Sequence, residues 1–393
     1  MYNQSAYEMG ASGCTIRELA AFGNMRAGIV GAENVFDFTI GNPSTPAPQI
    51  IEDTIRAVLA DTDSLKLHSY TSAVGDLATR QAIAEDLNRR FHTDAKAEEL
   101  FLGCGTSPEL AAVFRALSVE GSEILTIAPF FPEYAPFVEG AGAKLVIVPP
   151  KYPDFQIDPA AVEAAITDKT VAIIVNSPCN PTGVVYTRQS LEALAAVLTK
   201  KSAQLGRPIY IVADEPYREL TYGAEVTFIP HVYKDTIVCY SYSKSLSLAG
   251  ERLGYIYVPA FVTDSKALYT AISGAARAIG HICAPSIWQK VIARCAGAMP
   301  DVTDYDRNRR TLYDALTAMG YEMPYPDGAF YLFVKTPEGD ASAFLERAKQ
   351  KDLLIVPGDD FGCPEYFRLC YCVSYDKVLR SLPIFESLIK ETR

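Results

Sequence analysis

The stretch SYSKSLSLAGERLGY, Ser241 to Tyr255, decides how this chain is interpreted. It places a single lysine, Lys244, directly after an apolar run, with Arg252 eight positions later. A lysine amine becomes a nucleophile toward carbonyl groups when burial or neighbouring cations lower its pKa. The hydroxyls of Ser241 and Ser243 and the Arg252 guanidinium are donors suited to a phosphate. An exposed lysine in a serine-rich loop is the alternative interpretation, so the rest of the chain must decide.

Apolar runs alternate with helical patterns along the chain. Uninterrupted apolar runs flanked by helices predict strands covered on both faces, which is typical of an α/β layer with a mainly parallel sheet. Ligands of such sheets bind beyond the carboxyl ends of the strands. The runs are SEILTIAP (122–129), AKLVIVPP (143–150), TVAIIVNSP (170–178), PIYIVADE (208–215) and DTIVCYSYS (235–243). The helical patterns between them include 107–118 and 188–205.

Polar and aromatic clusters follow these runs. GTSPEL places Gly105, Thr106 and Ser107 at a helix start, where free N–H groups and the helix dipole favour a phosphate. A plain N-cap is the alternative there. In PFFPEY, Phe131 is available to stack on an aromatic ring, although core packing also explains it. In PCNPTG, Asn180 is expected to point its amide into the crevice, unless the motif is only a turn.

Asp214, in DEPY, ends an apolar strand, where an unpaired carboxylate would be costly. The pyridinium nitrogen of pyridoxal 5′-phosphate (PLP) is a suitable cationic partner, and keeping that nitrogen protonated makes the ring an electron sink. Tyr217 is placed to hydrogen-bond the ring hydroxyl oxygen. An Asx-turn at Asp214 is the alternative interpretation. Together with Lys244 and the phosphate donors, Asp214 indicates PLP as the cofactor.

Two further residues complete the candidate site. Arg368, in YFRLCYCVS, enters an otherwise apolar strand, so its guanidinium must be paired. A bidentate clamp on a substrate carboxylate suits arginine best, and a structural ion pair is the alternative. Tyr70, in HSYTSAVG, is expected either to reach a phosphate with its hydroxyl or to lie at an interface.

Composition excludes other classes of protein. The chain has 393 residues, 49% of them hydrophobic, and a net charge of −11. This charge argues against nucleic acid and anionic membranes as partners, and favours a small-molecule enzyme. No signal peptide or membrane-spanning run is visible, so a cytoplasmic location is expected. The nine cysteines and four histidines show no metal-ligand spacing, so no metal site is expected.

Taken in this order, the motifs resemble those of the fold type I, class I/II PLP-dependent aminotransferases. The resemblance runs from FTIGNPSTPAP (38–48) to FRLCYCVS (367–374), and SKSLSLAGERLGY, NPTG and DEPY carry it. It implies a large PLP-binding domain at residues 45–285, with a mainly parallel seven-stranded sheet between helices. It also implies a smaller, discontinuous α+β domain at residues 1–44 and 286–393.

The resemblance also implies roles for single residues. Lys244 would bind the cofactor covalently and then move the substrate α-proton, while Asp214 would hold the pyridinium and Asn180 and Tyr217 the phenolic oxygen. Arg368 would bind the substrate α-carboxylate. The remaining positions would hold the phosphate (Gly105, Thr106, Ser107, Ser241, Ser243, Arg252, and Tyr70 from the second subunit of a homodimer), stack on the ring (Phe131) or close over the substrate with the backbone (Gly41).

The implied activity is transfer of the amino group of an L-amino acid to a 2-oxo acid with ping-pong kinetics, with aspartate or an aromatic amino acid slightly favoured. Thr106-Ser107-Pro108 departs from the residue types of dicarboxylate-preferring relatives, and Arg277 is the candidate for a distal carboxylate. A carbon–sulfur β-lyase, a ring-forming synthase acting on an activated methionine and a decarboxylase of the same fold stay open. A catalytically inert binding or regulatory module is a further alternative, against which Lys244 argues.

Overall fold

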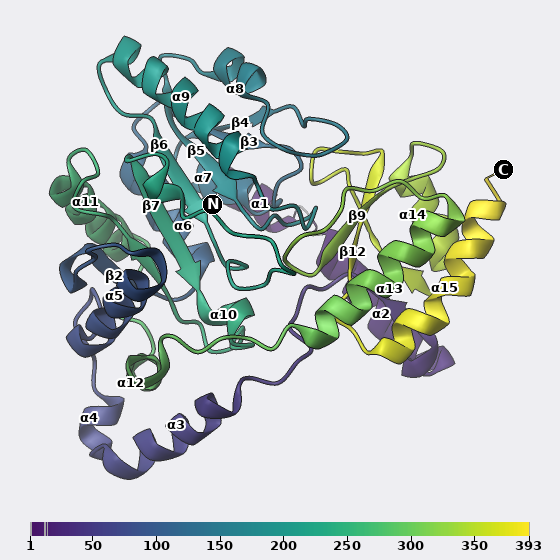
Figure 1. The fold of residues 1–393 in the computed structure, drawn as a ribbon, viewed down its shortest axis with the longest axis horizontal. Helices are drawn as coiled ribbons and strands as arrows, with labels where there is room; N and C mark the ends of the chain where they lie inside the picture. The colour runs from purple at the N-terminus through teal and green to yellow at the C-terminus, as the bar shows by residue number, and fades with distance from the viewer. Residues whose placement is uncertain (1, 12, 14, 393) are drawn as a thin grey trace.

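The computed structural model describes residues 2–11, 13 and 15–392 of the chain (Figure 1). A large sheet with its helices fills one side of the molecule, and a smaller group of strands and helices lies beside it. Segments from both ends of the chain meet in the smaller group, where Arg26 of α2 (Thr15–Val30), coloured purple, pairs with Asp352. In the same group α13 (Thr303–Met319) packs on α15 (Tyr375–Lys390).

The large sheet has seven strands, and all run parallel except β8, which is antiparallel to both of its neighbours. This confirms the prediction of a mainly parallel seven-stranded sheet, and the five apolar runs are β3 to β7. In spatial order the strands are β2 (Leu100–Gly103), β8 (Gly254–Tyr257), β7 (Thr236–Ser241), β6 (Tyr210–Asp214), β5 (Thr170–Asn176), β3 (Glu123–Ile127) and β4 (Lys144–Val148).

Helix α6 (Thr106–Leu117) shows how the sequence places the helices on this sheet. Its buried residues Leu110, Val113 and Phe114 follow the helical period, so one face packs against β2, β6, β7 and β8. The helix begins after Gly105, whose φ of 88° is a conformation that favours glycine. The N-terminus of α6 therefore lies at the carboxyl end of β2.

The other helices around the large sheet include one with clear local signals at both of its ends. Helix α9 (Arg188–Leu205) has the bounds of its predicted pattern, with Thr187 capping its start and Gly206 ending it in the left-handed region. The remaining members are η2 (Ala97–Glu99), α3 (Gln49–Asp61), α4 (Ser64–His68), α5 (Leu77–Phe91), α7 (Tyr134–Gly140), α8 (Pro159–Ala165), η3 (Ile229–His231), α10 (Tyr242–Ser245), α11 (Ser265–Ala278) and α12 (Ser286–Cys295).

The smaller group is built on a three-stranded antiparallel sheet in the order β11 (Val356–Pro357), β12 (Tyr366–Cys370) and β9 (Tyr331–Lys335). Beside it, β1 (Phe36–Asp37) pairs in parallel with β10 (Leu353–Leu354) and so joins the two ends of the chain. The boundaries proposed at residues 45 and 285 stay a prediction. The helices of the smaller group are η1 (Ala32–Asn34), α14 (Ala341–Lys349), α2, α13 and α15. Helix α1 (Gln4–Ala11) instead lies beside α7, and residues of both helices line one surface pocket (Figure 1).

No helix in the part of the chain that the structure describes is long and apolar enough to cross a membrane.

Candidate active site

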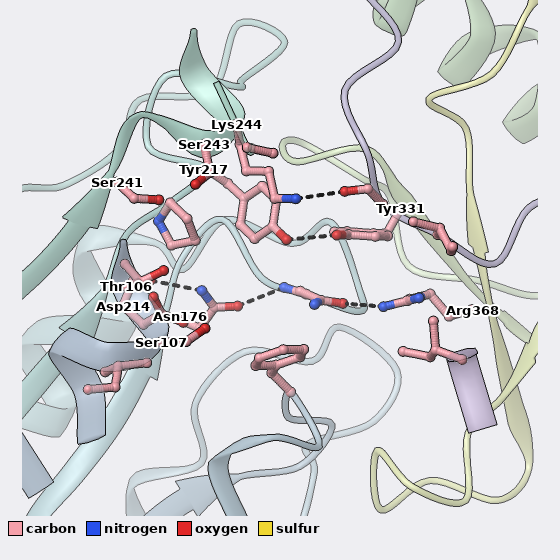
Figure 2. A pocket seen from close by; sticks show the side chains of 18 of the residues that line it. Thr106, Ser107, Asn176, Asp214, Tyr217, Ser241, Ser243, Lys244, Tyr331 and Arg368 are labelled. Atoms are coloured by element: carbon pink, nitrogen blue, oxygen red, sulfur yellow. Dashed lines mark hydrogen bonds between the residues drawn. The ribbon is translucent and has the colours of Figure 1, made fainter. Parts of the chain in front are cut away.

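A cavity of about 260 Å³ lies at the carboxyl ends of the central strands, where β9 and β12 of the smaller group approach the large sheet (Figure 2). Most of the predicted site residues line it: Gly41, Thr106, Ser107, Phe131, Asn180, Asp214, Tyr217, Ser241, Ser243, Lys244, Arg252 and Arg368. Sequence reasoning did not foresee several other lining residues: Ile16, Ile40, Leu110, Asn176, Pro216, Ala249 and Tyr331.

Lys244 lies on the short helix α10, which follows β7 directly. Its Nζ donates a hydrogen bond of 2.7 Å to the carbonyl oxygen of Gly41. Burial lowers the pKa of the Lys244 amine. The Cys372 and Cys370 thiols oppose this fall, and the Arg368 and Arg252 guanidinium groups add to it. A lowered pKa increases the share of neutral, nucleophilic amine at neutral pH. The alternative of an exposed loop lysine is therefore wrong.

Asp214 is the last residue of β6, and its carboxyl group is buried. Its Oδ2 accepts a hydrogen bond of 2.6 Å from the hydroxyl of Tyr134, whereas Oδ1 has no partner among the described residues. Burial raises the pKa of the carboxyl to about 7, although the hydrogen bond from Tyr134 opposes this rise. A cation reaching Oδ1 would favour the ionised form, which is the environment that a pyridinium nitrogen fits.

The hydroxyl-rich end of the cavity lies at the N-terminus of α6. Thr106 and Ser107 are the first two residues of this helix, where backbone N–H groups are free to bind an anion. Ser241 adds a buried hydroxyl that has no partner among the described residues. Asp214 Oδ1 and Ser241 Oγ are therefore unpaired polar atoms in one cavity, and this fits a cofactor that carries both a cationic ring and a phosphate.

Arg252 completes this end of the cavity. Its Nη1 donates to the hydroxyl of Ser243 at 3.3 Å and to the carbonyl oxygen of Ala249 at 2.9 Å. Gly105 does not line the cavity, but a Cβ at this position would lie 2.5 Å from Arg252 Nη2. Glycine is thus required there both for the backbone conformation and for the approach of the guanidinium.

A continuous chain of hydrogen bonds crosses the cavity from Asp214 to Arg368 (Figure 2). Asn176 Nδ2 donates to the Asp214 carbonyl oxygen at 2.8 Å, and Asn180 N donates to Asn176 Oδ1 at 2.7 Å. Arg368 then donates from Nη1 to Asn180 Oδ1 at 3.0 Å and from Nη2 to the Thr39 carbonyl oxygen at 2.5 Å. Asn176 was recognisable as a polar residue that ends an apolar strand.

The Arg368 guanidinium is buried, and its Nε has no partner among the described residues. Its two hydrogen bonds go to neutral oxygens, and no ion pair in the described part of the chain involves it. The alternative of a structural ion pair is therefore not seen. A buried cation held only by neutral acceptors is suited to bind a carboxylate ligand.

Aromatic side chains form one wall of the cavity. The hydroxyls of Tyr217 and Tyr331 lie 2.7 Å apart, and the Arg368 guanidinium lies 4.9 Å from the centroid of the Tyr331 ring. Phe131 also lines the cavity, in an edge-on contact with Tyr134. The sequence analysis singled out neither Tyr331 nor Tyr134: Tyr331 stands in an apolar segment, and Tyr134 ends PFFPEY, where only Phe131 was assigned a role.

Besides Gly105, two predicted residues lie outside the cavity. Tyr70 is 86% exposed and does not line it, so its role as a residue donated to a second subunit stays a prediction. Arg277 is exposed near the end of α11 and does not line the cavity either. Within the described chain, no group of three or more histidine, cysteine or acidic side chains is arranged to hold a metal ion.

The raised pKa of Asp214 predicts a pH-dependent stability of the cofactor-free protein. A carboxyl whose pKa is about 7 in the folded state and about 3.9 in the unfolded state takes up a proton on folding, so stability falls as pH rises between these values. Asp214→Asn removes this effect. The free energy of unfolding of the variant, relative to that of the wild type, should therefore rise by about 4 kcal/mol between about pH 4 and about pH 7. Urea unfolding at several pH values measures the difference, and parallel curves would contradict the assignment.

Comparisons with known proteins agree with this geometry. Residues 33–382 match the family described as Aminotransferase class I and II. The aspartate aminotransferase of Thermotoga maritima is 30% identical, with 93% of this chain and 94% of that protein covered. The aromatic-amino-acid aminotransferase 2 of Thermococcus litoralis is 26% identical over 92% of this chain and 94% of its own length. The crystal structure of an amino transferase from Eubacterium rectale is 51% identical, with a TM-score of 0.98 over 100% of this chain and 99% of that one.

Proposed function

We propose that this chain, which belongs to the class I and II aminotransferase family, moves the amino group of an L-amino acid to a 2-oxo acid with PLP as its cofactor. The observation that carries the proposal is the content of one cavity. It holds Lys244, whose pKa is lowered by burial, and two buried groups that lack partners among the residues that the structure describes. These are Asp214, with an unpaired carboxyl oxygen, and Arg368, with no ion-pair partner.

The residues of the cavity divide into groups that suit the parts of PLP. Asp214 would hold the pyridinium nitrogen, and Asn180 and Tyr217 the phenolic oxygen. Bound PLP supplies an electron sink for the electron pair left on the substrate α-carbon. Thr106, Ser107, Ser241, Ser243 and Arg252, with Gly105 giving Arg252 its space, are proposed for the phosphate, and Phe131 for the ring face.

Lys244 is proposed to carry the cofactor and then to move the α-proton of the amino acid. Burial and two nearby arginines keep its pKa below the usual lysine value, so the amine can accept a proton near neutral pH. Its hydrogen bond to the Gly41 carbonyl oxygen holds the amine at the junction of the two parts of the molecule. Ile16 and Ile40 line the same cavity and would help to exclude water from the amine.

Arg368 is proposed to bind the α-carboxylate that all amino acids share, with the backbone near Gly41 beside it. Arg368→Ala should lower kcat/KM by at least about 30-fold for every amino acid, because removing a buried charge that pairs with the ligand costs about 2–5 kcal/mol. Steady-state kinetics with several amino acids measures this loss. Arg188→Ala, at an exposed arginine on α9, is the control. A loss confined to one amino acid would contradict the role.

We also propose a homodimer in which Tyr70 reaches the phosphate in the partner's cavity. The proposal of a dimer is supported by exposed apolar side chains near Tyr70 in the chain, including Ile50, Leu59 and Leu65. Tyr70→Phe should weaken PLP binding about tenfold, the effect of about 1.4 kcal/mol for one charge-assisted hydrogen bond, without changing the dimer. Equilibrium dialysis measures the affinity and light scattering the mass. Unchanged affinity, or a monomeric wild type, would refute the proposal.

The substrate class is open among acidic, aromatic and small neutral amino acids, with aspartate or an aromatic amino acid slightly favoured by resemblance. Arg277 is the candidate partner for a distal carboxylate, although in this chain it lies outside the cavity lining. Ping-pong kinetics is expected, because each amino acid leaves its amino group on the enzyme before the 2-oxo acid enters. A cytoplasmic location stays a prediction.

The test is a single-turnover panel of PLP-loaded protein mixed with each amino acid without any 2-oxo acid. Stoichiometric 2-oxo acid and pyridoxamine phosphate from one or a few amino acids would support the aminotransferase proposal and identify the substrate. Pyruvate with ammonia, formed over many turnovers, would instead indicate the alternative, a carbon–sulfur β-lyase of the same fold. An amine with carbon dioxide would indicate a decarboxylase.

A further inference from the structure

A buried carboxyl group, that of Glu109 in the first turns of α6, takes no part in the proposed chemistry. Its side chain is 2% exposed, and neither carboxyl oxygen has a hydrogen-bond partner among the described residues. Buried carboxyl groups in folded proteins are nearly always paired, so an unpaired one calls for an explanation.

Two glycines leave the space that the Glu109 carboxyl fills. Gly103, which ends β2, and Gly254, which begins β8, are directly paired in the sheet. A Cβ on Gly103 would lie 2.6 Å from Glu109 Oε1, and a Cβ on Gly254 would lie 2.5 Å from the same atom. A side chain at either position would force the carboxyl to move, so the two glycines leave open the space that it occupies. Glu109 therefore points from α6 onto the sheet rather than toward solvent.

This site lies directly behind the proposed phosphate-binding end of the cavity. Glu109 is two residues beyond Ser107, and its backbone N–H donates to Gly105 O at 3.4 Å in the same turn. On the sheet, Gly254 also pairs with Ser241, whose unpaired hydroxyl faces the cavity. The Glu109 carboxyl and the proposed phosphate site thus both lie at the N-terminus of α6 and beside the Gly254–Ser241 pair of the sheet.

Several titratable groups from the neighbouring elements face Glu109. Asp214 on β6 raises the pKa of the Glu109 carboxyl, and Arg252, before β8, opposes that rise. Burial is the largest cause and raises the pKa well above its usual value. A charge on Glu109 raises the pKa of the Cys104 and Cys239 thiols. His281 lines a small pocket beside α11 together with Glu109 and Cys104. Arg252 is the cation that interacts with Glu109, and it is also a proposed phosphate ligand.

We propose that Glu109 is a proton-linked positioning residue for the cofactor phosphate, so that PLP binds only to the protein whose Glu109 carboxyl is protonated. An ionised Glu109 would compete with the phosphate dianion for Arg252 and for the N-terminus of α6, since both anions are stabilised by the same guanidinium and helix dipole. A neutral carboxyl leaves both for the phosphate. The inference rests on the proposed function, because it requires a phosphate at this end of the cavity.

The test measures binding of pyridoxamine 5′-phosphate, which has no aldehyde and forms no covalent bond with Lys244. By linkage, Kd of the wild type should rise by nearly tenfold for each pH unit above the pKa of the Glu109 carboxyl, followed by calorimetry up to about pH 10. Glu109→Gln should lose this rise. Glu99→Gln, at another buried glutamate that accepts a hydrogen bond from Lys96 N, should keep it. Any contribution of Lys244 titration is common to all three proteins.

Two further measurements make the result independent of the variant's folding. Wild-type binding measured in two buffers of different ionisation enthalpy should show net proton uptake in the pH range where Kd rises. Pyridoxamine without phosphate should bind without this uptake. Equal pH dependence in the wild type and Glu109→Gln, or equal proton uptake with and without the phosphate, would overturn the inference and leave the proposed function intact. Failure of pyridoxamine 5′-phosphate to bind at any pH would overturn both.

Discussion

Lys244→Ala should lower kcat for transamination by about 10⁵-fold or more, the size of loss seen when the nucleophile of a covalent enzyme is removed. The loss is expected to be this large because one amine serves as both the proposed attachment point and the proposed base. The absorbance band of PLP joined to a lysine should disappear, while PLP still binds through the phosphate and pyridinium contacts. The absorbance band and the rate of transamination are measured on one sample, the first by absorbance and the second by single-turnover product analysis.

The control is Lys234→Ala, which should keep full activity. Lys234 is an exposed lysine just before the start of β7, whereas Lys244 follows the end of that strand. A small exogenous amine should restore part of the activity of Lys244→Ala, because it replaces the missing base. A merely structural lysine would not be rescued in this way. Activity of Lys244→Ala within tenfold of the wild type would end the aminotransferase mechanism proposed here.

Asp214→Asn should lower kcat by between about 100-fold and several thousandfold in the cofactor-loaded protein. Asparagine keeps the shape of the side chain but removes the charge, and loss of one partner of a buried ion pair costs about 3–5 kcal/mol. Without that charge the pyridinium loses its proton more readily, and the ring accepts the electron pair less well. Stopped-flow measurement of the first half-reaction isolates this step from binding of the second substrate.

Tyr134→Phe gives a graded comparison for the Asp214 prediction. It removes the hydrogen bond to Asp214 Oδ2 but keeps the carboxyl group. Because that hydrogen bond lowers the pKa of Asp214, its loss should reduce kcat by less than Asp214→Asn does, by about tenfold for a bond of about 1.4 kcal/mol. If Asp214→Asn were the milder of the two variants, the proposed partnership with the pyridinium would be wrong.

The sequence determined the elements of the large sheet and the places where they end. Uninterrupted apolar runs predicted β3 to β7 because a strand covered on both faces needs apolar residues on both. Turn-forming and polar residues after each run then placed the site at the carboxyl ends of the strands. These signals are local, because the hydrophobic period, the composition and the turn-forming residues of an element can all be recognised within a window of about ten residues. The same locality explains why α9 has the bounds of its predicted pattern.

Only the tertiary structure decided which distant groups touch. The Lys244 amine meets the Gly41 carbonyl across 203 positions, and Arg368 meets Asn180 across 188. The hydrogen bond from Tyr134 to Asp214 and the fit of Glu109 against Gly103 and Gly254 have no local signal either. Such contacts depend on the register between strands and on the packing of a helix on a sheet, and these follow from burial of the whole core. The sequence specified the chemical groups, and packing of the core set their partners and their pKa values.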